Sequence, residues 1–505
     1  MKNILQLILV FFSISPVFSQ SIDDSFSKDK MKKDLEVFKN IRLKANSGLY
    51  KHRTEKEIDS IYNWAETEIE NSRTYRDFYN IICQLSDFEG STHNSVTISS
   101  KKWKTILVEK EGYFPYPIKL IEGKWILNFQ TDEIPLGSQI ISINGRKMSE
   151  IVKELYKYYE TDGKNISGKR IGLASSFSRY YRLNYGLENT FEVVYKAPDS
   201  ENELNINLQS VGFIDSYKNK IKRYSEPFDK LDFTDSDDLK EKYSYKEISS
   251  QTGILTIDSF NIGGNAESPE HKEFVVFLDS TFLALKNNNT KNLIIDIRHN
   301  GGGSDPNDLV VYKYLSKRNF SENKSAWISF NKIPYLKYIE TKVPTFLRFL
   351  GVTKHNKYLQ KEFPVEIDGK FYQDETSEDH KVRVPNKNAF HGQLYLLISP
   401  RVASAASNFG SLVASNDNLT IIGEETQGGY YGHNGHSPIS YILPKSKITT
   451  TFSIVNIEQD VIIKEKQLKH RGIMPDYEIT QTHSDYLNHI DTQMNFVFDL
   501  IDKEK

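Results

Sequence analysis

The chain of 505 residues contains a single cysteine, Cys83. One cysteine forms neither an internal disulfide nor a multi-cysteine zinc site. The fold must therefore be held together by hydrophobic cores, for which 38% hydrophobic residues are sufficient. Cys83 lies in the apolar segment Tyr79–Leu85 and is expected to fill a core rather than to act as a nucleophile.

An excess of one charge is also missing, with 65 Lys and Arg against 67 Asp and Glu. Nucleic-acid binders usually carry a basic excess or stripe, and no basic patch interleaved with aromatics occurs here. No nucleic-acid partner is therefore expected. The Gly-Lys-Ser/Thr ending of a phosphate loop is absent as well. We expect no cofactor and no metal.

Long hydrophobic runs are absent beyond the first twenty residues, so no integral membrane segment is expected in the mature protein. The beginning of the chain differs: Lys2 precedes the apolar run Ile4–Phe12, and small residues follow near Val17 and Ser19. This pattern is typical of a secretory signal over 1–19, with cleavage near Ser19 and export to the periplasm or the outside. A buried N-terminal helix is the alternative.

The remaining length exceeds one core and favours several domains. Helical spacing of apolar residues dominates the first part, where Thr54 and Glu57 form an expected capping box. Short alternating strands follow, and then a strand–helix alternation with continuous apolar strands typical of a parallel sheet. The predicted divisions are a helical domain over 20–103, a β-rich domain over 104–215, a polar linker over 216–247, an α/β core over 248–480 with an insertion at about 318–390, and a C-terminal helix over 481–505.

Three segments rich in glycine or small residues each follow an expected strand. Asp296–Gly303 ends in three glycines, which can present amides to an anion, although a tight turn is the alternative. Ile398–Phe409 puts Ser404 at a helix N-terminus, where free amides stabilise an oxyanion; an ordinary helix cap is the alternative. Gly423–Gly435 is a glycine-rich loop. Because strand ends gather at one sheet edge, where ligands usually bind, we expect these segments to form one site.

Together these segments resemble the tail-specific, or C-terminal-processing, serine peptidase family, in its tricorn-like and interphotoreceptor retinoid-binding-like branch. The upstream segments Ser47–Tyr50, Gly90–Ser95 and Leu136–Asn144 are similar to parts of the same branch. The family motifs and their matches are Asp-x-Arg-x-Asn-x-Gly-Gly at 296–303, Ser-Ala-x-Glu/Ser at 404–407, Gly-Glu-x-Thr-x-Gly at 423–428 and Gly-Val/Ile-x-Pro-Asp at 472–476.

The resemblance implies an α/β catalytic core of the crotonase-like ββα superhelix type, with an N-terminal helical domain and a PDZ-like β-rich domain. It further implies a serine-type endopeptidase in which Ser404 attacks a peptide carbonyl. The amides of Gly303 (or Gly302) and Ala405 would hold the oxyanion. The expected partner is a peptide or protein substrate, which the PDZ-like domain would bind as an added strand, with the chain's C-terminus as one option.

The resemblance also bears on the catalytic base. Family members with a Ser–Lys dyad carry lysine directly after Gly-Glu-x-Thr-x-Gly, where this chain has Gly429. A histidine is expected instead, because its pKa near neutrality suits proton abstraction. His93, in a Gly-x-x-His segment, matches the family's base, and His433 and His436 are its rivals.

The supporting acid is less defined. The family's glutamate, three residues before Gly472, is Lys469 here, which leaves Glu424, Glu465 and His433 as candidates for support. His299 is expected beside the site without acting as base. The missing lysine also leaves open a catalytically inactive homologue that binds peptides or hydrophobic ligands, and a plain scaffold is a third option.

Overall fold

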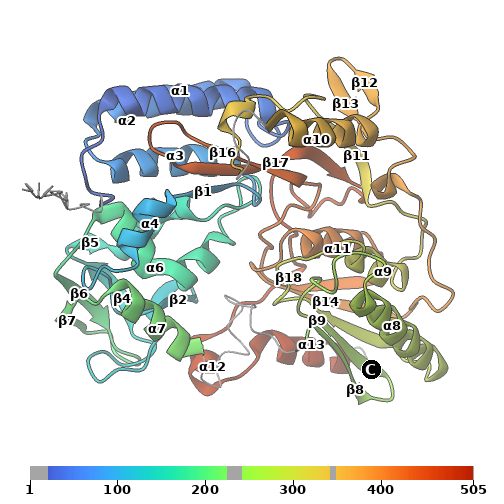
Figure 1. Ribbon diagram of the computed structural model, residues 1–505. Helices are drawn as coiled ribbons and strands as arrows, with labels where there is room; N and C mark the ends of the chain where they lie inside the picture. Colours follow the sequence, from blue (N-terminus) through green and yellow to red (C-terminus); the bar gives the residue numbers. More distant parts are fainter. Residues whose placement is uncertain (1–20, 225–240, 342–347, 504–505) are drawn as a thin grey trace, which may run out of the picture.

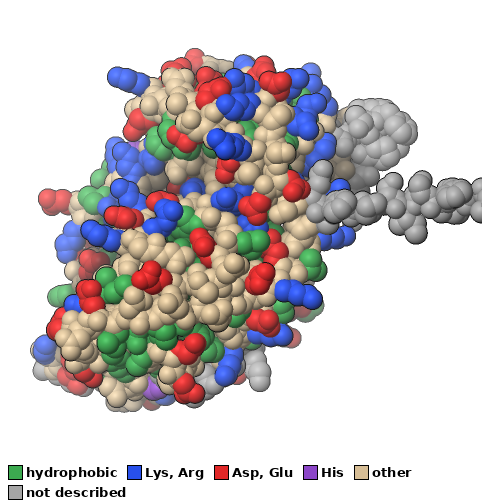
Figure 2. Space-filling view, turned by 90° about the vertical axis from the view of Figure 1, so that its left-hand side faces the viewer, with side chains coloured by type: hydrophobic (Ala, Val, Ile, Leu, Met, Phe, Trp, Pro, Cys, Tyr) green, Lys and Arg blue, Asp and Glu red, His purple; other side chains and the backbone are tan. Residues whose placement is uncertain are grey.

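The computed structural model describes residues 21–224, 241–341 and 348–503 (Figure 1). The signal expected over 1–19 lies outside the described residues. Among the described helices, none combines the length and the apolar character needed to cross a membrane. On the face shown in Figure 2, basic and acidic side chains are interspersed.

The helices predicted near the N-terminus are confirmed. Helix α2 begins at the predicted capping box, in which Thr54 and Glu57 each accept a hydrogen bond from the other's backbone amide. Cys83 is buried among the apolar faces of these helices, and burial raises the pKa of its thiol, which fits a core side chain. The helices are α1 (Lys28–Ala45), α2 (Glu55–Asn71), α3 (Tyr75–Glu89) and α4 (Ser100–Ile106).

Residues 104–215 contain an antiparallel sheet of order β2-β3-β4-β6-β7, with β5 paired to β4. Its buried face packs against α5 and α6 around Phe114, Ile143 and Phe191. The strands are β2 (Ile118–Ile121), β3 (Lys124–Leu127), β4 (Gln139–Ile143), β5 (Arg146–Lys147), β6 (Thr190–Lys196) and β7 (Glu203–Gln209); the helices are α5 (Met148–Leu155), the 3₁₀ helix η1 (Tyr156–Tyr158) and α6 (Lys169–Tyr185).

The α/β core holds a second sheet, of order β18-β15-β14-β10-β9-β8, in which only β8 runs antiparallel to its neighbour. Helices α8, α9 and α11 pack on one face, and α13 packs on the other (Figure 1). The strands are β8 (Tyr243–Ser249), β9 (Thr252–Ile257), β10 (Asn292–Asp296), β14 (Gln393–Ile398), β15 (Leu419–Gly423) and β18 (Tyr477–Glu478); the helices are α8 (Pro269–Asn287), α9 (Asn307–Lys313), α11 (Ala405–Ala414), α12 (His483–Asn488) and α13 (Thr492–Lys503).

The third sheet joins distant parts of the chain, in the order β1-β17-β11-β13-β12 with β16 also paired to β17. Strand β1 from the N-terminal region is antiparallel to β17, so that Val96 lies opposite Thr450. Helix α1 packs on this sheet through Ile41. The elements are β1 (Ser95–Thr97), β11 (Asn323–Ile328), the 3₁₀ helices η3 (Leu336–Tyr338) and η5 (Glu378–His380), α10 (Arg348–Glu362), β12 (Val365–Ile367), β13 (Lys370–Tyr372), β16 (Asn434–Ile442) and β17 (Thr449–Gln459).

Three sequence predictions differ from this arrangement. The C-terminal helix predicted over 481–505 is divided into two helices, α12 and α13, by residues 489–491. The segment at about 318–390 does not simply cover the core, because its strands complete the third sheet. The range 216–247, interpreted as a linker, is helical at its start in α7 (Phe213–Tyr224) and extended at its end in β8. Residues 225–240 lie outside the described part. Lys and Glu side chains made this range look solvated, although α7 has an apolar face that packs Phe213 against Trp103 and Tyr113.

Candidate active site

The three predicted loops meet at the carboxyl edge of the parallel strands β10, β14 and β15. The first loop is fixed by Arg298, which forms ion pairs of 2.7 Å with both Asp296 and Asp491. The Arg298 carbonyl accepts a hydrogen bond from the hydroxyl of Ser399 at 2.5 Å. This bond ties the first loop to the segment that leads into α11, which carries Ser404.

Ser404 occupies the position before the first residue of α11, yet its side chain makes no capping hydrogen bond. Its backbone has φ 52° and ψ −132°, a conformation that L-residues other than glycine rarely adopt. The Oγ atom instead lies 3.2 Å from Nε2 of His93. The side chain is therefore aimed at an imidazole, and the alternative of an ordinary cap does not describe it.

His93 reaches Ser404 from the N-terminal region. It lies in the turn between α3 and β1, and the pairing of β1 with β17 fixes that turn against the rest of the molecule. Burial lowers the pKa of His93 below its ordinary value, while the negative charge of Asp162 opposes this shift. The imidazole is accordingly neutral at pH 7 and able to accept a proton.

Asp162 is a residue that sequence reasoning missed. Its buried carboxylate accepts hydrogen bonds from the amide of Thr92 at 2.8 Å and from the amide of Gly429 at 3.0 Å. Burial raises the pKa of Asp162, and the charge of His93 and the two amides oppose that shift. Asp162 thus joins the loop that carries His93 to the glycine loop. No motif marks it, because it lies between η1 and α6, remote in sequence from both loops.

The residues predicted to bind the oxyanion differ in whether their backbone amides already donate a hydrogen bond. The amide of Gly302 donates to Oδ1 of Asn300 at 2.9 Å and is therefore occupied. Among the described residues, the amides of Gly303 and Ala405 donate to no group. Gly302 has φ 113°, and a Cβ atom there would lie 2.8 Å from Cβ of Ser404. Glycine at this position lets the two loops touch.

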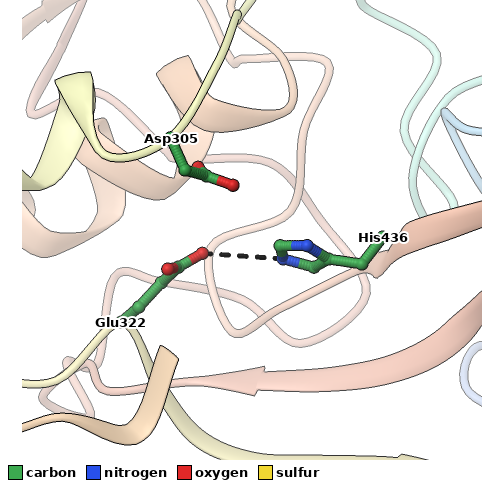
Figure 3. Close-up of side chains that lie close together, drawn as sticks. All are labelled: Asp305, Glu322 and His436. Carbon is green, nitrogen blue, oxygen red and sulfur yellow. Dashed lines mark ion pairs between the residues drawn. The ribbon is translucent and has the colours of Figure 1, made fainter. Parts of the chain in front are cut away.

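The other histidines lie close to His93 in different ways. The ring of His433 stacks on that of His93, with 5.3 Å between centroids. Burial and then the charge of His93 lower the pKa of His433 well below its usual value, so it is a neutral packing partner. His436 points away toward Glu322, 3.6 Å from its carboxylate (Figure 3). His299 lies near Asp296, and its charge acts on that carboxyl group.

The glutamates considered as support point elsewhere. Glu424 forms an ion pair with Arg170 at 2.9 Å, and Glu465 is exposed. The neighbouring Glu425 binds Arg471 and the amide of Gly472. Within the part of the chain that the structure describes, none of these three glutamates contacts His93, whereas Asp162 acts on it through its charge.

A groove begins beside His93. A pocket of 260 Å³ is lined by Thr92, Val96, Tyr79 and Tyr158, and a larger pocket of 570 Å³ shares the last three residues and extends past Trp103. Both pockets follow β1, which is an edge strand: within the described ranges it pairs with β17 alone. An extended chain could reach the Ser404–His93 pair along this edge.

Comparison with known proteins agrees with the resemblance of the motifs. Residues 251–479 match Peptidase family S41. No curated protein matches the chain by sequence. Among solved structures, mature CPAF complexed with lactacystin is 15% identical with a TM-score of 0.57, covering 94% of this chain and 99% of that one. Mature CPAF alone gives 14% identity, a TM-score of 0.56 and coverage of 91% and 96%.

The photosystem II D1 C-terminal processing protease is 12% identical over 89% of this chain and 92% of that one, with a TM-score of 0.35. At these identities the likeness to CPAF shows a shared fold of mixed helix and sheet content. The predicted family is confirmed by the match over 251–479.

Proposed function

Since residues 251–479 place the chain in peptidase family S41, we propose that it is a serine peptidase with Ser404 as nucleophile and His93 as base. The observation that carries this proposal is the 3.2 Å separation of His93 Nε2 and Ser404 Oγ, which is within reach of proton transfer. The unused amides of Gly303 and Ala405 beside that pair support it further.

The proposed reaction is acyl transfer. Ser404 Oγ bonds to the peptide carbonyl carbon while its proton moves to Nε2 of His93, and the amides of Gly303 and Ala405 bind the oxyanion. The amine leaves with the proton from His93. Water then attacks the acyl-enzyme with His93 again as base, and the released acid restores Ser404.

Asp162 takes the supporting role that the sequence left open among Glu424, Glu465 and His433. Its negative charge favours the imidazolium that forms when His93 takes the proton. Its two amide hydrogen bonds also hold the His93 turn against the glycine loop. His433 contributes by stacking on the imidazole.

We propose that substrates are extended peptides that approach along β1. Ser95 and Thr97 of this edge strand are exposed, and its free side offers backbone groups for pairing. The aromatic residues Tyr79, Tyr158 and Trp103 line the groove and favour apolar side chains. The β-rich domain over 104–215 serves as the PDZ-like domain of this proposal and binds a second part of the substrate. The crotonase-like description of the core over 248–480 belongs to the same proposal.

A fluorophosphonate probe tests the nucleophile. The unaltered protein should be labelled at Ser404 and should cleave casein, and Ser404→Ala should do neither. Ser407→Ala is the matched control, because the Ser407 hydroxyl donates to the Ser404 carbonyl and does not face His93. If the unaltered protein neither takes the probe nor cleaves casein, the inactive ligand-binding homologue is the better description.

We also propose export, on the basis of the apolar run Ile4–Phe12 behind Lys2. Expression of the full chain in a bacterial host should yield a periplasmic or secreted protein whose first residue lies close to Gln20. Recovery of the intact chain with Met1 in the cytoplasm would contradict this.

A further inference from the structure

A second group of chemically active side chains lies next to the proposed site. Asp305, Glu322 and His436 point toward one another (Figure 3). One donor atom from each residue lies within 4.8 Å of the other two, and His436 Nε2 is 3.6 Å from a Glu322 oxygen. The proposed catalytic mechanism uses none of the three.

The three residues come from separate segments that border the proposed active site. Asp305 follows Gly303 by two residues, on the loop whose amide faces the oxyanion. His436 follows His433 by three residues, in strand β16. Glu322 immediately precedes β11. A bound ion that joined these three residues would hold the loop at Gly303 against the glycine loop, whose His433 stacks on His93.

The spacing suits a cation between the three groups better than direct hydrogen bonds. A separation of 3.6 Å is too long for a hydrogen bond. Ligands at about 2.0–2.2 Å from a tetrahedral zinc ion lie roughly 3.3 Å apart. A small inward movement of the three side chains would therefore complete a metal-binding geometry.

The charges of the three side chains also favour a bound cation. Glu322 is buried, and its carboxylate lies together with that of Asp305 and the imidazole of His436. Two carboxylates thus face a single imidazole, so negative charge prevails in the cluster. A divalent cation would satisfy the same carboxylates and free the imidazole nitrogen as a ligand.

The buried carboxylate of Asp308 independently indicates that a cation would be favourable at this place. Its side chain is fully buried, and its Oδ2 accepts a hydrogen bond from Asn408 at 2.8 Å. Its Oδ1 has no hydrogen-bond partner among the described residues. The charges of Asp305 and Glu322 act on this carboxyl group, so it lies beside the cluster. A buried carboxylate oxygen without a donor is costly unless a cation is near.

We propose that Asp305, Glu322 and His436 bind one divalent transition-metal cation of the zinc class, with Asp308 as a nearby carboxylate. One imidazole and two carboxylates form a mixed nitrogen and oxygen set that such ions accept, and the three protein ligands leave further positions open. The bound ion stabilises the arrangement of the oxyanion loop and the glycine loop. The ion takes no part in the acyl transfer itself.

Calorimetric titration of the Ser404→Ala protein with zinc chloride tests the site without self-cleavage. We expect one site per chain with a dissociation constant at or below the micromolar range, and a rise in melting temperature with zinc but not with magnesium. Glu322→Gln and His436→Gln should each weaken binding at least tenfold. Asp305 is exposed, so Asp305→Asn keeps the protein folded and should also weaken binding.

Asp379→Asn is the matched control. The charge of Asp379 acts on Asp305, Glu322 and His436, but its carboxylate is not among the three clustered donors. Binding should change less than threefold in this variant. The absence of a stoichiometric site, or an equal loss in the control and ligand variants, would overturn the metal site and leave the peptidase proposal intact.

Discussion

The amide of Gly429 donates a hydrogen bond to the carboxylate of Asp162 at 3.0 Å. Gly429 occupies the position at which Ser–Lys members of the family carry their lysine. The same carboxylate acts on His93 through its charge. The position that carries lysine in the dyad arrangement therefore contributes a backbone amide here, to the carboxylate whose charge acts on His93.

Gly429→Lys should not convert the protein to a Ser–Lys peptidase. A Cβ atom at 429 would lie 2.9 Å from the carbonyl oxygen of Gly432, so the loop must shift to admit a side chain. We expect activity to fall at least tenfold, and His93→Ala in the same protein to remain inactive. Activity that survives His93→Ala only in combination with Gly429→Lys would show that a lysine can serve as base here.

His93→Ala should lower kcat/KM on the order of 1,000-fold or more, because no other imidazole contacts Ser404 among the described residues. His433→Ala removes only a stacked neighbour and should retain most of the activity. Peptide hydrolysis by the two variants, with circular dichroism as a check on folding, compares them. A greater loss in the His433 variant would reverse the assignment of the base.

Asp162→Asn should lower kcat on the order of 100-fold or more. The amide side chain keeps the size of the carboxylate but loses the charge that favours protonated His93. Its NH₂ group cannot accept a hydrogen bond, so either Thr92 or Gly429 loses the acceptor for its backbone amide. Glu424→Gln, which removes an ion pair with Arg170 away from His93, is the control and should leave kcat within a few-fold. Equal effects of the two substitutions would remove Asp162 from the mechanism.

The pH profile follows from the direction of the His93 shift. Burial lowers the pKa of His93, so kcat/KM should stay level near neutrality and decline only below pH 6.5, as the free imidazole gains a proton. The charge of Asp162 raises that pKa, so residual activity in Asp162→Asn should decline at a lower pH still. An acid limb centred above pH 7 would contradict a buried neutral base.

Gly302→Ala should impair the site sterically. The new Cβ atom would lie 2.8 Å from Cβ of Ser404, at a residue with φ 113°. We expect a loss of activity of at least 100-fold and a cost of about 1–3 kcal/mol in the free energy of unfolding. Gly264→Ala adds a methyl group to open space and should change neither quantity. Denaturant titration and peptide hydrolysis measure both effects.

Much of the fold was predictable from local pattern. The apolar runs that became β10, β14 and β15 are buried on both faces of a parallel sheet, and the capping box at Thr54 marks the start of α2. The linker interpretation was less accurate, because the charged residues of α7 suggested a solvated segment, whereas Phe213 at the start of this helix packs against Trp103 and Tyr113. The third sheet was not predicted, since β1 pairs with β17 across more than 300 residues and β11 pairs with β17 across more than 100.

The predicted nucleophile segment, the glycine loops and the expectation of a histidine rather than a lysine as base follow from the sequence by itself, because they depend on residue types at fixed local spacing. Only the tertiary structure decided that the charge of Asp162 acts on His93, that Gly302 has already used its amide, and that Asp305, Glu322 and His436 meet. Each of these contacts joins segments whose separation along the chain leaves no periodic signal. Their proximity results from sheet pairing and core packing, which act over the whole molecule.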